Sequence, residues 1–513
     1  MLFSLVVFIL AHIVLTKCRT RKPLPPGPRA DPIIGHLRKI PPPHQLSDVF
    51  HEWAKKYGDV MYLEVLGRKM VILDTLEAAT DLLEKRSSIY SCRPNMVIFS
   101  MMGCDRQLST LQYGRRFLLH RKLLQNYFGR QESMVFNPIS YEESIVMVKR
   151  LMDNPTNYDK IIARYMTRIV AKIAYGYSVK DDNDTFAILV NKVGEMMHNS
   201  GPPASTPVDF FPWLAHFPSW FPGTYYAEYA RKWRSLTLEF INYPFNYTIK
   251  QLSEGKAQPS FVSKLISDME TQEIEDQEDY MEDIKHAASM LYGAGVETSW
   301  GTLVVFLIAM VLHPEYQAKA QIEIDAVCGH NRLPTFEDHD SLPYIEYIMR
   351  EVMRWHPVVP MGIPHRSLED DVYNGMFIPA GSIVFANIRG MGLHEHIYKD
   401  ATAFNPDRFI PKSQGRQGGA ISITIWVWTK LNVFDWSFNR ICPGRFLAES
   451  TLWIAMAMIL ATCNIGKAKD ANGTEITPEV EFDSGFVDHL KPFDFALVPR
   501  TAQARTIVEE THR

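Results

Sequence analysis

The segment from Asn439 to Arg445, Asn-Arg-Ile-Cys-Pro-Gly-Arg, constrains this chain more than any other, because it leads directly into a helix-like run, Phe446 to Met456. A cysteine between a cation and a Pro-Gly turn at a helix start lies where backbone N–H groups and the helix dipole favour negative charge. Cys442 therefore has the surroundings of a metal-ligating thiolate. Free cysteine also packs as a small buried hydrophobe, and this segment alone leaves both interpretations open.

The overall composition argues against several classes of protein. The chain has 513 residues, 46% of them hydrophobic, which is enough to bury a large core. Its 54 basic and 58 acidic side chains give no strong global charge that would favour nucleic-acid binding. The cysteines are scattered without CxxC spacing, so we expect neither a disulfide framework nor a zinc cluster.

The N-terminal segment predicts a membrane anchor. Residues 2–16 are almost entirely apolar, and a group of cations follows between Lys17 and Lys22. Signal peptides carry their positive charge before the apolar stretch, so this order favours a signal anchor with the bulk of the protein in the cytoplasm. A cleaved signal is the alternative. The Pro-rich residues 23–29 cannot form a helix or a central strand, and we expect them to form a stiff linker.

The body of the chain is predicted to be mainly helical with a small β region. Residues 59–75 fit two strands around a turn that contains Gly67. Helical periodicity returns at Leu76 and dominates most of the remaining chain. Residues 358–388 are rich in Pro, Gly and β-branched side chains, which predicts short strands and turns. Residues 88–110 show little periodicity, so we expect a long functional loop there.

Three further segments have an unusual side-chain composition. Residues 113–128 predict a basic amphipathic helix, whose cations form either a solvated face or a site for an anion such as a carboxylate. Residues 202–223 are rich in Pro, Phe and Trp, so they either pack in the core or dip into lipid and admit apolar substrates. The acidic run 270–283 is predicted to be a solvated segment that starts the next helix.

That next helix, predicted from Met281 to Leu312, contains Gly-Ala-Gly-Val-Glu-Thr-Ser at residues 293–299. Each glycine costs about 1 kcal/mol in a helix interior, and Glu297 and Thr298 would need partners if buried. A local opening of the helix at a functional site would account for this, with Glu297 and Thr298 relaying protons. The alternative is a glycine contact between helices, with Thr298 bonded to the preceding turn.

Two charged motifs lie further along the chain. A helix predicted from Leu342 to Trp355 carries Glu351 and Arg354 three residues apart, and therefore on one face. Taken alone, such a pair is common on protein surfaces and contributes little. The segment Phe404 to Phe409 is predicted to be a turn that carries one cation, Arg408.

The order and spacing of these motifs resemble those of the cytochrome P450 haem-thiolate monooxygenases. In its detailed amino-acid sequence, the chain is similar to a fungal microsomal member of that family. The motifs that carry the resemblance are the Pro-rich linker after an anchor, Ala294-Gly295-x-Glu297-Thr298, Glu351-x-x-Arg354, Pro406-Asp407-Arg408-Phe409 and Arg440-x-Cys442-Pro443-Gly444. The resemblance covers nearly the whole chain. It implies a mainly helical P450 fold with a small β region, an N-terminal anchor over residues 1–22, a linker over 23–29 and a single haem-thiolate catalytic domain over 30–513.

The resemblance also implies a cofactor site for haem b. Cys442 would be its axial ligand, with a thiolate that favours O–O cleavage. The residues expected to contact the haem are Cys442, Arg440, Arg121, His365, Ala294 and Gly295. Of these, the cations and His365 would contact its propionates.

The remaining motif residues would serve catalysis and structure. Glu297 and Thr298 would line the oxygen pocket and guide proton delivery. Glu351, Arg354 and Arg408 would form a buried charged network behind the haem, with a structural role.

The sequence departs from the family pattern in two places. Before the cysteine, Asp435 and Phe438 stand where the family has Phe and Gly, and that glycine lets the backbone approach the haem and aim N–H donors at the sulfur. Because similarity resumes abruptly at the Arg before the cysteine, we hypothesise that residues 415–439 include a gene-model error, which sequencing the transcript would settle. In the basic helix, Phe117 and Leu118 replace the usual Trp and Arg, which removes one propionate donor.

The resemblance implies a monooxygenase, an oxidoreductase acting on paired donors, that inserts one oxygen atom from O2 into a hydrophobic small molecule. Electrons would come from NADPH-cytochrome P450 reductase docked on the face nearest Cys442, with cytochrome b5 as a further candidate. A single-pass anchor would hold the protein in the endoplasmic reticulum membrane with its catalytic domain cytoplasmic. Two alternatives stay open: a haem-deficient, non-catalytic member, and a haem-thiolate isomerase or dehydratase that needs no reductase.

Overall fold

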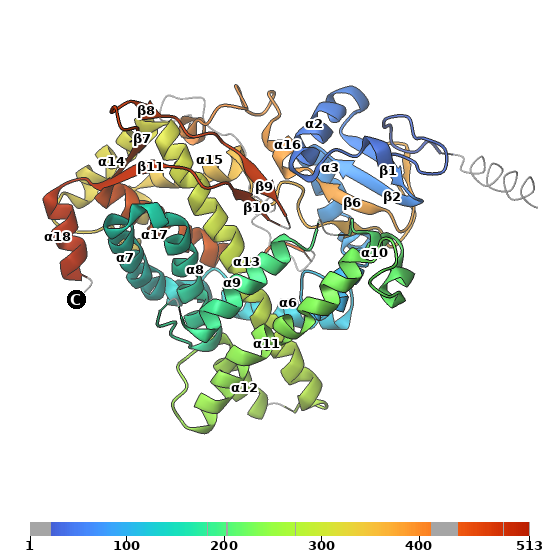
Figure 1. Ribbon diagram of the computed structural model, residues 1–513, viewed down its shortest axis with the longest axis horizontal. Coiled ribbons are helices and arrows are strands. Elements are labelled where there is room, and N and C mark those ends of the chain that lie inside the picture. Colours follow the sequence, from blue (N-terminus) through green and yellow to red (C-terminus); the bar gives the residue numbers. More distant parts are fainter. Residues whose placement is uncertain are drawn as a thin grey trace, which may run out of the picture.

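Helices form most of the protein, and small sheets lie beside them (Figure 1). The computed structural model describes residues 22–181, 183–201, 204–271, 273–411, 440–485 and 487–511. Within these residues the prediction of a mainly helical chain with a small β region is confirmed. The predicted anchor and the altered segment before Cys442 lie outside the described residues, at 1–21 and 412–439.

Helices cover each of the segments for which the sequence predicts one. Those of the described residues are α2 (Leu46–Tyr57), α3 (Leu76–Ala79), α4 (Ser87–Tyr90), α5 (Val97–Met101), α6 (Arg115–Phe128), α7 (Asn137–Asp153), α8 (Tyr158–Tyr175), α9 (Thr185–His198), α10 (Pro207–Phe210), α11 (Tyr225–Ser253), α12 (Phe261–Glu270), α13 (Gln277–Leu312), α14 (Pro314–Cys328), α15 (Pro343–Trp355), α16 (Ile388–Gly392), α17 (Arg445–Thr462) and α18 (Ala502–Thr511). The predicted loop 88–110 contains α5, so it is only partly irregular.

Helix α13 runs through the middle of the molecule and packs on α6, α8, α11, α15 and α17 (Figure 1). Of the two interpretations of residues 293–299, the structure contradicts the helix opening, because residues 277–312 form one continuous α-helix. The Thr298 hydroxyl donates to the Ala294 carbonyl over 2.7 Å, and a Cβ at Gly295 would lie 3.4 Å from a Val170 methyl group on α8. The alternative, a helix contact at glycine with Thr298 bonded back, describes the structure.

The acidic segment before α13 does start the helix, because the Asp276 side chain accepts from the backbone N–H of Asp279. It is not simply solvated, however. Arg116 of α6 contacts Asp279 over 2.5 Å and Asp283 over 2.8 Å, and His120 contacts Asp283 over 3.0 Å. Most residues of the segment before Asp279 are exposed, as predicted, and only Asp283 of the two contacted carboxylates is buried.

The largest sheet joins strands that are far apart in the sequence, in the order β1-β2-β6-β3. Strands β1 (Val60–Val65) and β2 (Arg68–Leu73) form the predicted antiparallel hairpin, and its turn places Leu66 at φ 50° and Gly67 at φ 81°. Its other strands are β6 (Ile383–Ala386), parallel to β2, and β3 (His365–Arg366), antiparallel to β6.

The described residues form three smaller sheets, in the orders β11-β7-β8, β10-β9 and β4-β5. Their strands are β4 (Asp371–Tyr373), β5 (Met376–Ile378), β7 (Cys463–Lys469), β8 (Glu475–Ile476), β9 (Phe482–Ser484), β10 (Asp488–Leu490) and β11 (Phe495–Pro499). The predicted strands and turns of residues 358–388 are thus confirmed.

Two helices of the described residues, α13 and α17, are long and apolar enough to cross a membrane. Most of each is buried, 72% and 61% of the most apolar window respectively, as is usual for core helices. Residues 22–29 lie against the sheets, since Tyr62 N–H donates to the Pro26 carbonyl over 3.0 Å and Phe377 N–H to the Pro23 carbonyl over 2.7 Å.

Candidate active site

A cavity of about 340 Å³ lies between α6, α9, α13 and the start of α17. It brings together most of the residues that the sequence singles out. Those that line it are Arg121, Ala294, Gly295, Glu297, Thr298, His365, Arg440 and Cys442. The rest of its wall is mainly apolar, with side chains such as Met166, Ile169, Val193 and Met290.

Cys442 is a free, half-buried cysteine two residues before the N-cap of α17. Burial raises the pKa of its thiol to about 11, while a hydrogen bond from the Gly444 backbone and the charge of Arg121 lower that pKa. The stabilising N–H expected from the sequence is therefore present, but loss of solvent outweighs it. Direct ligation to a metal cation would reverse the balance, because a coordinated thiol loses its proton.

Three arginines from distant segments meet at the cavity wall: Arg93, Arg121 and Arg440. Burial is the main cause that lowers their pKa, to about 9 for Arg93, about 10 for Arg121 and about 8 for Arg440. Arg93 also adds to the lowering at Arg440. Within the described part of the chain, no carboxylate forms an ion pair with any of the three.

Backbone carbonyls hold these guanidinium groups only in part. Arg440 donates to the carbonyls of Ser91, Leu108 and Leu111 over 2.7, 3.1 and 2.8 Å. Arg93 donates to the Ile363 and Pro364 carbonyls, and Arg121 to the Ile441 carbonyl. Among the described residues, the Arg93 Nε and Arg121 Nη2 atoms are buried without a partner, and no carboxylate there balances the charge of the cluster.

The two substituted positions on α6 lie differently. Phe117 is buried, and the Arg440 guanidinium lies 3.7 Å from its ring centroid, which gives that cation an aromatic face. Leu118 is exposed. His365 on β3 shares a hydrogen bond with the Tyr90 carbonyl over 2.8 Å; burial, reinforced by Arg93, holds the pKa of its imidazole well below the ordinary value.

The charged motif on α15 lies outside the cavity lining and is the most deeply buried ion network of the described residues. Arg354 contacts both Glu351 oxygens over 2.7 Å, and Arg408 contacts Oε1 over 3.1 Å. Glu351 and Arg354 are 0% and 1% exposed. The remaining donors of Arg354 reach the carbonyls of Gly392 and Ala401, so the three predicted network residues are in contact and well satisfied.

Comparison with known proteins decides the family. The cytochrome P450 family model matches residues 25–495. The chain is 36% identical to "Cytochrome P450 monooxygenase 136" of Postia placenta, over 95% of this chain and 91% of that protein. It is 35% identical to "Cytochrome P450 monooxygenase claR" of Ampulloclitocybe clavipes, over 95% of this chain and 88% of that protein.

The chain belongs to the cytochrome P450 family. The family implies a haem-thiolate centre, and the cavity of this P450 fits one. Haem carries two propionate carboxylates, and three buried guanidinium groups without a carboxylate partner are a matching site. Cys442 supplies a sulfur donor on the same cavity wall.

Sequence reasoning missed two residues of this P450 cavity. Arg93 falls in a segment for which the sequence predicts only an irregular loop, and no motif contains His489. Both belong to short stretches without periodicity, and their contacts are with residues far along the chain: Arg93 with Pro364, and His489 with Glu297. A lone cation before Pro94 was the one available signal for Arg93.

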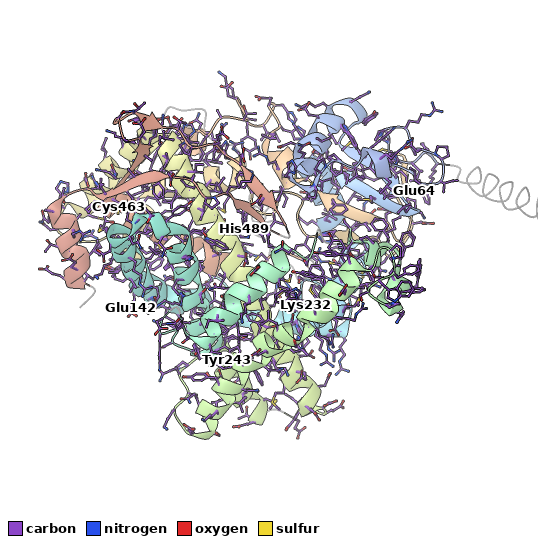
Figure 2. All side chains as sticks on the ribbon, in the orientation of Figure 1. Glu64, Glu142, Lys232, Tyr243, Cys463 and His489 are labelled. Carbon is purple, nitrogen blue, oxygen red and sulfur yellow. The ribbon has the colours of Figure 1, made fainter. Side chains whose placement is uncertain are left out.

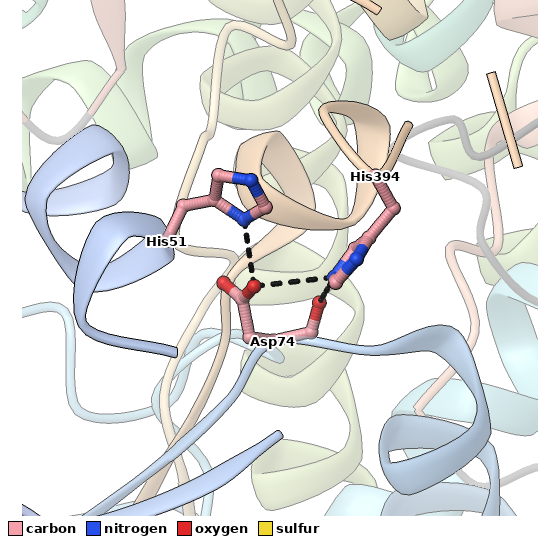
Figure 3. A group of neighbouring side chains, drawn as sticks. All are labelled: His51, Asp74 and His394. Carbon is pink, nitrogen blue, oxygen red and sulfur yellow. Dashed lines mark hydrogen bonds and ion pairs between the residues drawn. The ribbon is translucent and has the colours of Figure 1, made fainter. Parts of the chain in front are cut away.

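A second group of titratable side chains lies away from the cavity of the P450 (Figure 3). His51 Nδ1 and His394 Nε2 lie 2.7 and 3.2 Å from the same Asp74 oxygen, Oδ2. Asn387 donates to the other oxygen over 2.7 Å. Because the carboxylate is already occupied by these donors, the group is a hydrogen-bonded junction of α2, β2 and the segment after α16.

Proposed function

We propose that this P450 is a haem-dependent monooxygenase that inserts one oxygen atom from O2 into a hydrophobic small molecule, with electrons from a reductase. The observation that carries the proposal is one apolar cavity that holds both Cys442 and a cluster of buried arginines, for which the described part of the chain supplies no carboxylate partner. The relatives named as monooxygenases over nearly their full length support it.

Each residue of the cavity would have a role that follows from its position. Cys442 would ligate the haem iron, and Arg93, Arg121 and Arg440 would pair with the propionates. When bound, haem supplies the oxygen-activating redox chemistry. Thr298 would present a hydroxyl to the cavity, fixed by its bond to Ala294. The apolar wall would exclude water and select a hydrophobic substrate.

Exposed aromatic side chains support the proposed membrane location. Trp213 and Trp220, between α10 and α11, are 51% and 80% exposed, in a segment for which core packing was the alternative. The ring of Phe210 lies 4.9 Å from the Arg68 guanidinium at the start of β2, so this segment borders the sheet against which residues 22–29 lie. We infer an orientation that brings the aromatic segment and the anchor to one endoplasmic reticulum membrane surface.

The reduced carbon monoxide difference spectrum tests the thiolate assignment. The wild-type chain should show the strongly red-shifted haem band of a thiolate ligand, and Cys442→Ala should abolish it because the ligand is lost. Cys328→Ala is the matched control, since Cys328 is a buried free cysteine outside the cavity lining, and it should keep the band. A band that survives in Cys442→Ala would refute the assignment.

Oxygen uptake tests the reaction class. A monooxygenase consumes O2 only when NADPH-cytochrome P450 reductase and NADPH are both supplied, whereas a haem-thiolate isomerase or dehydratase turns over without them. A wild-type chain that takes up no haem would instead support the non-catalytic alternative.

A further inference from the structure

Glu297 is held between two segments that are far from it in the sequence. Its Oε2 atom lies 2.9 Å from Nε2 of His489 on β10. Its Oε1 atom lies against Gly194 of α9, where a Cβ would come within 2.6 Å of it. The absence of a side chain at residue 194 thus makes room for the carboxylate at the wall of the cavity.

His489 is itself positioned by an aromatic contact one turn further along α13. Its ring centroid is 4.6 Å from that of Trp300, and Trp300 Nε1 donates to Asp159 of α8 over 2.9 Å. Figure 2 shows His489 near the centre of the molecule, beside α13. The β9–β10 hairpin therefore places one imidazole beside two carboxylates, those of Glu297 and Asp159.

Further titratable side chains surround His489. Burial raises the pKa of the Asp159 carboxyl, while the hydrogen bond from Trp300 and the nearby His489 lower that pKa. The ring of His198 on α9 lies edge-on to the ring of His489, with the two ring centroids 5.7 Å apart. Asp483 on β9 is the residue opposite His489 in the β9–β10 pair. The side chains of His489 and Glu297 are 19% and 24% exposed, so water can reach the pair.

We propose that His489 is a positioning residue that fixes the Glu297 carboxylate at the cavity wall and exchanges protons with it. The His489 imidazolium gives its Nε2 proton to the Glu297 carboxylate at Oε2, the resulting Glu297 carboxyl group gives a proton to water in the cavity, and the neutral His489 takes a replacement proton from solvent. No oxidant or reductant enters these steps. The inference rests on the proposed monooxygenase function, and it adds a link from the hairpin to the acid on α13.

Two substitutions separate positioning from proton transfer. His489→Gln keeps a donor but cannot carry an exchangeable charge, and His489→Lys keeps the ion pair. In the full-length, haem-loaded chain, His489→Gln should lower reductase-driven oxygen consumption on the order of tenfold, less than the roughly 10²–10⁴-fold that loss of an acid–base group itself costs. It should also change the solvent deuterium isotope effect. His489→Lys should recover part of the rate.

The control is Lys491→Gln, which breaks an exposed 2.9 Å ion pair with Glu481 near the same hairpin and should leave both readouts unchanged. An unaltered rate and isotope effect in His489→Gln, with its haem band intact, would overturn the proposal. So would equal effects in the control.

A double-mutant cycle gives a readout that does not depend on turnover. His489→Gln and Glu297→Gln should each lower the thermal unfolding midpoint, and the double variant should lower it no further than the larger single effect. Additive losses would show that the two side chains are not linked. If the wild type lacks the thiolate haem band, the proposed function fails, but this cycle still decides whether His489 holds Glu297.

Discussion

At the scale of single residues, the buried charges divide into those that have partners and those that do not. Glu351 satisfies two arginines and a backbone N–H at 2.6 Å, so its network is complete without any ligand. Arg121 has one carbonyl partner and a bare Nη2 atom. The first arrangement indicates stability, and the second indicates a binding site.

Removing the carboxylate from the complete network should be costly. Glu351→Gln leaves Arg354 and Arg408 buried without a counter-charge, and we expect a loss of about 3–5 kcal/mol in the free energy of unfolding. The control Glu346→Gln on the same helix breaks a partly exposed 2.6 Å pair with Arg350, for about 0.3–0.5 kcal/mol. Thermal and denaturant unfolding measure both, and similar losses would contradict the structural role of the network.

Removing a cation from the arginine cluster at the cavity should weaken haem binding instead of lowering the stability of the fold. Arg121→Met should not lower the free energy of unfolding of the haem-free chain, because it removes a buried charge that has no counter-charge among the described residues. Haem retention should fall about 10–100-fold, measured as transfer to excess apomyoglobin. Arg115→Met, at an exposed position on the same helix, should retain haem normally. Normal retention in Arg121→Met would remove this residue from the proposed cofactor site.

At the scale of elements, the His51–Asp74–His394 junction connects α2, the end of β2 and the segment after α16. Asp74 raises the pKa of His394 above its ordinary value, mainly through their hydrogen bond. A group with a raised pKa in the folded state stabilises the protein when protonated. Its contribution is therefore complete below the unfolded pKa and is lost as pH rises through the folded pKa.

Unfolding midpoints of the wild type and His394→Gln should therefore differ most at low pH. The difference should shrink as pH rises above the ordinary histidine pKa of about 6.5 and through the raised pKa of His394, as the imidazolium is lost. His396→Gln, at the exposed neighbouring imidazole, should follow the wild type at every pH. A difference that grows with pH would show that neutral His394 carries the stabilisation.

Elements were predictable where local chemistry marks their ends. The hairpin turn at Gly67 and the helix that starts at Pro343 and ends before His356-Pro357 agree closely with the structure. The sequence could not decide between an opening of the helix near Gly293 and a contact between helices. The deciding fact is that Val170 of α8 occupies the space beside Gly295, which only the packing of the two helices shows. Arg93 and His489 were missed for the same reason. Their contacts are with residues distant in the sequence, and the packing that creates such contacts is not encoded in any local pattern.

At the scale of the whole molecule, the order of motifs gave the family, and the resemblance supplied roles that individual motifs did not. Glu351-x-x-Arg354 alone is an ordinary surface pair, yet in the structure both side chains are almost fully buried. The mainly helical content was predictable from periodicity. The size and shape of the cavity were not.

The parallel pairing of β2 with β6, Met70 opposite Ile383, has a consequence for biosynthesis. The ribosome must add most of the chain before the edge of the first hairpin can find its neighbour. At about 5–20 residues per second, this takes on the order of tens of seconds. During that interval an apolar strand edge lies open to other nascent chains, so chaperone supply, more than intrinsic stability, should limit the yield of this protein.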